Sequence, residues 1–68
     1  MTVYQTWLPG NREEDPIIYP ATTDRMTVLA ELRKHPFRGR YVTIWEGLER
    51  QGHLMFKPGQ RVTLDDFA

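Results

Sequence analysis

The segment between residues 22 and 36 limits the fold of this chain more than any other, because its ends are marked and its interior is helical in pattern. The run Thr-Thr-Asp at 22–24 offers side-chain oxygens that can accept a backbone N–H of a first helical turn. Apolar side chains recur at helical spacing in the interior, at Val28, Leu29 and Leu32. Pro36 cannot continue a helix, so we expect a helix that ends near Lys34.

The residues on both sides of this helix favour strands. β-Branched and aromatic residues gather in short runs, and prolines and glycines separate the runs. We expect two strands before the helix and three after it, at residues 2–8, 17–19, 41–45, 53–56 and 61–64. This order, ββαβββ, predicts one α+β domain over residues 1–68, with one helix packed on a small antiparallel sheet of four or five strands.

Residues 41–51 also admit a helix. Such a helix would place Tyr41, Ile44, Trp45 and Leu48 on one face and end at Gly52, and residues 53–64 would form a two-stranded wing. The alternative fold is then a degenerate winged helix. That fold needs two earlier helices, whereas residues 1–22 offer strands, and the β-formers at 41–45 disfavour a helix. The sheet is therefore the favoured interpretation.

The small size of the chain makes a binding partner an early expectation. A chain of 68 residues buries only about 60% of its unfolded surface, and without cysteine no disulfide can brace it. A homodimer or a complex with another protein would supply the missing burial. No apolar run is long enough to span a membrane, the N-terminus lacks a signal-peptide pattern, and we expect a cytoplasmic protein.

The residues needed for catalysis are scarce. The chain has neither serine nor cysteine, so a serine or cysteine nucleophile cannot be built. His35 and His53 lie far apart in sequence and lack carboxylates at metal-ligand spacing, and the glycines are isolated turn residues. We therefore expect no enzymatic activity, no metal and no cofactor.

Alternation along the predicted strands separates two sets of large apolar side chains. If the helix covers Val42, Ile44, Leu54 and Phe56, then Tyr41, Trp45 and Met55 face the other way, and Trp7 can extend that second set. Each tryptophan taken alone fits core burial slightly better than an exposed anchor, but one helix cannot bury both faces of a sheet. Tryptophan, tyrosine, methionine and arginine are enriched at protein interfaces. We therefore predict a partner-binding surface with a basic rim, made by Trp7, Tyr41, Trp45, Met55, Arg38 and Arg40.

A basic segment at residues 33–40 supports an alternative function. Arginine and lysine contact phosphates, and Phe37 could stack on a base, so a nucleic-acid surface could use Arg33, Lys34, Arg38, Arg40 and Arg50. The formal net charge is zero, whereas a dedicated nucleic-acid-binding domain is usually basic. Cations at the end of a helix followed by a solvated loop explain the segment more simply.

The order of the predicted elements is similar to that of a known class of proteins. A hairpin, the run Pro-Ile-Ile-Tyr-Pro-Ala-Thr-Thr-Asp leading into one helix, then Tyr-Val-Thr-Ile-Trp and a closing hairpin resemble small phage-encoded inhibitor proteins. These include some anti-CRISPR proteins and a phage inhibitor of bacterial RNA polymerase. The resemblance implies a protein that occupies a functional surface of a host protein complex, and it assigns no role to any residue.

Overall fold

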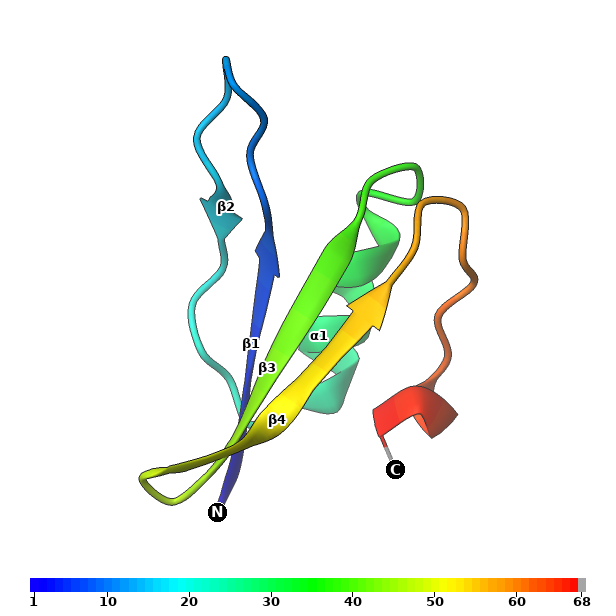
Figure 1. Ribbon diagram of the computed structural model, residues 1–68. Coiled ribbons are helices and arrows are strands. Elements are labelled where there is room, and N and C mark those ends of the chain that lie inside the picture. The colour runs from blue at the N-terminus through cyan, green and yellow to red at the C-terminus, as the bar shows by residue number, and fades with distance from the viewer. Residues whose placement is uncertain (68) are drawn as a thin grey trace.

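The computed structural model describes residues 1–67 and contains one α-helix and a four-stranded sheet within them (Figure 1). The elements in chain order are β1 Thr2–Leu8, β2 Ile17–Ile18, α1 Arg25–Arg33, β3 Arg40–Glu46, β4 Glu49–Phe56 and a 3₁₀-helix, η1, at Leu64–Phe67. Neighbouring strands are antiparallel, and the sheet order is β2-β1-β3-β4. The predicted α+β class with a single helix and an antiparallel sheet is confirmed.

The helix α1 begins and ends where its sequence signals predict. Asp24 is the N-cap, and its Oδ1 accepts a hydrogen bond from the backbone N–H of Met26 at 3.0 Å. The hydroxyl of Thr27 donates to Oδ2 of the same carboxylate at 2.9 Å. The C-cap is Lys34, two residues before Pro36, because the proline ring cannot enter the helix.

One face of the sheet is covered by α1 (Figure 1). The buried side chains of the helix are Val28, Leu29, Glu31 and Leu32, and its three aliphatic members pack against residues that point inward from the strands. The core of this layer is completed by Tyr4, Val42, Phe56, Val62 and Phe67, with Ile44 and Leu54 partly buried at its margin. The alternation predicted for the sheet is therefore present, with even-numbered residues of β1 and β3 toward the helix.

Residues 41–51 are extended and turn back on themselves, so the winged-helix alternative is wrong. β3 and β4 pair from Arg40 opposite Phe56 to Glu46 opposite Glu49. Gly47 lies in the connecting turn with φ of 62°, a left-handed conformation that glycine adopts without steric cost. The pairing of two β-forming segments outweighs the helical spacing of their apolar residues.

The fifth strand expected at residues 61–64 does not form, and η1 follows instead. The backbone N–H of Thr63 donates to Oδ2 of Asp66 at 2.8 Å, and the N–H of Asp66 donates to the carbonyl of Thr63 at 3.1 Å. This turn directs Phe67 into the core, where its ring lies 6.1 Å from that of Tyr4 and 6.2 Å from that of Phe56. The chain thus buries the aromatic ring of Phe67 in the core and does not form a fifth strand.

Candidate functional site

The sheet face opposite α1 carries a row of large apolar side chains, one from each strand. Ile18 is opposite Trp7, Trp7 is opposite Tyr41, and Tyr41 is opposite Met55. Residues directly opposite one another in antiparallel strands point to the same face, so these four side chains lie side by side. We call them the apolar row. Ile18 is 63% exposed and Met55 is 56% exposed, while Trp7 and Tyr41 between them are partly buried.

The two aromatic rings at the centre of the apolar row are held in place. The rings of Trp7 and Tyr41 stack with their centroids 4.5 Å apart and an angle of 17° between their planes. The indole N–H of Trp7 donates to the hydroxyl of Thr43 at 3.0 Å. Because stacking fixes the plane of the indole and the hydrogen bond fixes its direction, Trp7 loses little conformational entropy when something binds to it.

Two further rows continue this open face toward the β3–β4 turn. Gln5, Thr43 and His53 form a polar row, and the side-chain amide of Gln5 donates to the carbonyl of Tyr19 at 3.3 Å. Val3, Trp45 and Arg50 form the last row, in which Trp45 is partly buried and Arg50 is exposed. The open face is therefore apolar at one end, neutral and polar in the middle, and mixed at the other end.

The structure places all four apolar residues that the sequence predicts for partner binding on the open face. Trp7, Tyr41 and Met55 are neighbours in the apolar row, whereas the polar row separates Trp45 from them. Ile18 belongs to the same surface but was not predicted. Its position follows from pairing with Trp7, and the loop of eight residues between β1 and β2 hides that register in the sequence. Neither tryptophan lies in the buried core cluster of the described residues.

Arg40 does not belong to the rim of this surface, so that prediction is wrong. Its side chain is 1% exposed and lies among backbone carbonyls on the helix side of the sheet. The guanidinium donates to the carbonyls of Leu32 and Gln60 at 2.8 Å each, and to those of Arg38 at 3.2 Å and Lys57 at 3.3 Å. Burial lowers the pKa of Arg40 below its ordinary value. Arg40 ties the end of α1 and the segment after β4 to β3, which is a structural role.

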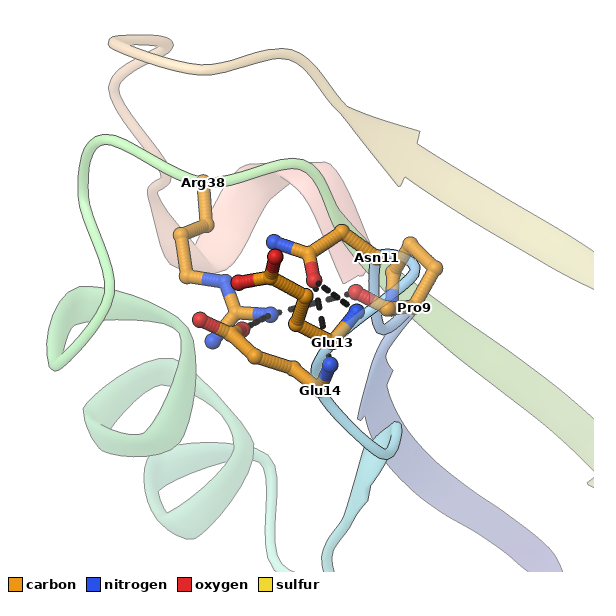
Figure 2. A network of polar contacts seen from close by, with 5 residues as sticks. All are labelled: Pro9, Asn11, Glu13, Glu14 and Arg38. Carbon is orange, nitrogen blue, oxygen red and sulfur yellow. Dashed lines mark hydrogen bonds and ion pairs between the residues drawn. The ribbon is translucent and has the colours of Figure 1, made fainter.

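Arg38 lies at the edge of the molecule, where two loops meet (Figure 2). Its guanidinium is 3.4 Å from the carboxylate of Glu14 and donates to the carbonyl of Pro9 at 3.1 Å. Oδ1 of Asn11 accepts the backbone N–H groups of Glu13 at 2.9 Å and Glu14 at 3.0 Å. These contacts brace the loop between β1 and β2 against the loop before β3. An open hollow of about 390 Å³ lies beside them, lined in part by Phe37 and Pro58.

The residues of the predicted nucleic-acid surface do not form one surface. Arg33 donates to the carbonyl of Val62 at 3.1 Å, and Arg40 is buried. Arg50 pairs with Trp45 near the β3–β4 turn, at the opposite end of β3 from Arg40. Lys34 is exposed at the end of α1, on the other layer of the molecule. A phosphate backbone could therefore not contact the whole set together.

The two histidines occupy separate places. Nε2 of His35 lies 2.8 Å from the hydroxyl of Tyr19, and this contact joins the chain after α1 to the chain after β2. His53 is exposed in the polar row of the open face. Within residues 1–67, no three histidine, aspartate or glutamate side chains gather as ligands for a metal ion. None of the helices in that range has the length and apolarity needed to cross a membrane.

Comparisons of this chain with models of protein families, with curated proteins and with solved structures found no match.

Proposed function

We propose that this protein is a protein-binding module and that the open face of its sheet is the binding surface. The observation that carries the proposal is the apolar row, in which Ile18 and Met55 are more than half exposed beside the stacked rings of Trp7 and Tyr41. Large apolar side chains gathered on an exposed surface typically mark a site of interaction. Rigid aromatic rings are favoured as anchors in such sites, because they bury much area and lose little entropy.

The chemistry of the open face favours a protein partner over a nucleic acid. Nucleic-acid affinity depends on several cations that contact phosphates together. Arg50 is the one arginine that pairing within the described strands places on this face, and the remaining cations of the alternative set lie elsewhere. The stacked aromatic rings of the apolar row lie beside a neutral polar row, and protein interfaces likewise combine apolar and polar parts.

The resemblance in element order supports a more specific proposal about the partner. We propose that the partner is a protein complex of a host cell, that binding inhibits it, and that the encounter takes place in the cytoplasm. The prediction of binding without catalysis belongs to the same proposal. It draws its support from the open face and from the absence of a serine or cysteine nucleophile in the sequence.

The proposal is tested by capturing the partner from a lysate of the organism in which the protein acts. We expect Trp45→Ala and Met55→Ala to lower capture by about 30-fold or more, because interface anchors contribute about 2 kcal/mol or more each. Phe37→Ala is the matched control, since Phe37 is 83% exposed and lies outside the open face. Nuclease treatment should leave capture unchanged.

Three results would contradict the proposed function. Capture that survives both substitutions would show that the open face is not the binding surface. Unfolding of the Trp45→Ala variant, detected by circular dichroism, would show that Trp45 is needed for the fold. Trp45 would then not be an anchor of the binding surface. Capture that disappears with nuclease would favour the nucleic-acid alternative.

A further inference from the structure

The two edges of the sheet are protected to very different degrees against pairing with a further strand. The β2 edge is two residues long and lies between Pro16 and Pro20, which cannot donate to a neighbouring strand. The β4 edge runs from Glu49 to Phe56 without a proline. Within residues 1–67, the inter-strand hydrogen bonds of β4 go to β3 alone, and no other backbone hydrogen bond reaches it. One side of β4 therefore presents unpaired backbone groups.

The chain that follows β4 does not close this edge. After the turn at Lys57–Gln60 it passes to the helix layer, where the carbonyl of Val62 accepts a hydrogen bond from Arg33. Leu54 remains only partly buried at the margin of the core, and Met55 ends the apolar row with more than half of its surface exposed. A further strand beside β4 would cover both side chains.

The charges along β4 indicate what kind of strand would fit. Pairing with β3 puts Arg50, His53 and Met55 on the open face. Continuing the strand alternation beyond the end of β4 would give Lys57 the same side. Arg50 and Lys57 are exposed, and neither takes part in an ion pair among the described residues. The register shift between Ile44 and Trp45 leaves Gln51 without a β3 partner, so the regular part of the edge is Gly52–Phe56, with a cation beyond each end.

A second copy of the chain does not suit this edge. Antiparallel pairing of β4 with itself would bring the Arg50 end of one copy beside the Lys57 end of the other, on the same face. Two cations would meet at each end of the new pair, and like charges across an interface are unfavourable. A strand with carboxylates at those two places would instead be attracted.

We propose that the β4 edge binds an extended, acidic segment of a partner protein, which adds to the sheet as a fifth, antiparallel strand. The segment carries a carboxylate opposite Lys57, an apolar residue two positions later opposite Met55, and a second carboxylate four positions after that, opposite Arg50. The apolar residue lengthens the apolar row by one member. This inference rests on the proposed function only in taking the partner to be a protein.

The test uses the full chain and a synthetic peptide of sequence Glu-Thr-Val-Val-Thr-Thr-Glu, capped at both ends. Titration followed by amide chemical shifts should move the signals of residues 50–57. N-Methylation of alternate peptide bonds, which removes the donors that would pair with β4, should abolish the shifts. A peptide with lysine at both ends should bind the unaltered protein at least about tenfold more weakly, because its charges oppose those of Arg50 and Lys57.

Charge reversal on the protein supplies the matched comparison. The Lys57→Glu variant should lose at least about tenfold in affinity for the acidic peptide and should regain it with the lysine peptide. Arg12→Glu changes the net charge equally but lies in an exposed loop, and it should leave binding within about twofold. Both variants alter exposed side chains, so both should fold.

Three results would overturn the inference. The first is an absence of shifts in β4 at millimolar peptide. The second is binding that N-methylation does not weaken. The third is sedimentation of the free protein as a dimer with protected β4 amides, which would show that a second copy occupies the edge. The two proposals can be refuted independently. If Trp45→Ala left partner capture unchanged, the open face would not be the binding surface, but peptide binding at the β4 edge could still be observed.

Discussion

Removal of the buried guanidinium of Arg40 should destabilise this protein more than removal of any other charged side chain of the 33–40 segment. The Arg40 side chain is 1% exposed and donates four hydrogen bonds, all to backbone carbonyls. The carbonyl of Leu32 belongs to α1, and those of Lys57 and Gln60 belong to the turn after β4. In Arg40→Ala these acceptors lose their donor while remaining inside the structure.

The expected loss follows from the number and kind of these bonds. A hydrogen bond that involves a charged group contributes about 1.5–3 kcal/mol, and the cost of burying a cation without a carboxylate partner offsets part of the sum. We expect Arg40→Ala to lower the free energy of unfolding by about 3–5 kcal/mol. A chain of 68 residues has a total stability of about 3–10 kcal/mol, so the loss is at least about a third of the total.

Urea unfolding followed by circular dichroism measures this loss. Arg40→Lys should be intermediate, because an ammonium keeps the charge but cannot span carbonyls that the planar guanidinium reaches together. Arg38→Ala is the control and should cost less than about 1 kcal/mol, since its ion pair with Glu14 lies at the surface. A loss below about 1 kcal/mol for Arg40→Ala would refute the structural role of this residue.

Two further substitutions and one control substitution test the helix start and the loop beside Arg38. Asp24→Ala should lower the melting temperature at pH 7, because the hydroxyl of Thr27 and the N–H of Met26 lower the pKa of the Asp24 carboxyl below its ordinary 3.8. The ionised form is thus favoured in the folded state, so the difference from the unaltered protein should be full above pH 3.8 and disappear as the pH falls through the lower, folded pKa. Gly10→Ala should destabilise the protein by about 1–3 kcal/mol, because its Cβ would lie 2.1 Å from the carbonyl oxygen of Glu14. Gly39→Ala, where a Cβ has open space, should be close to neutral in the same thermal melts.

The main features of the fold could be predicted because local signals and burial agree. The cap at Asp24 and the block at Pro36 define α1, and alternation at residues 41–45 assigns Val42 to the helix side and Tyr41 to the open face. Since α1 covers one layer of the sheet, the exposure of Met55 follows from geometry. These conclusions need only the periodicities of helices and strands.

The features that could not be predicted depend on contacts between distant parts of the chain. Arg40 resembles its exposed neighbours in sequence, and only the meeting of α1 with the turn after β4 gives its guanidinium three of its four acceptors. The β-formers at residues 61–64 predict a strand, but the burial of Phe67 against Tyr4 is a long-range effect that local propensity does not contain. The place of Ile18 in the apolar row likewise depends on a register across a long loop.

The central claim, that the open face is uncovered in the free protein and covered by its partner, can be tested by solvent relaxation in NMR. A soluble gadolinium chelate should broaden the methyl signal of Met55 and the indole signals of Trp45 in the free protein, and leave the methyl signals of Val28 and Leu32 sharp. Addition of the captured partner should restore the Met55 and Trp45 signals. Signals that are already protected in the free protein, or that stay broadened in the complex, would contradict the claim.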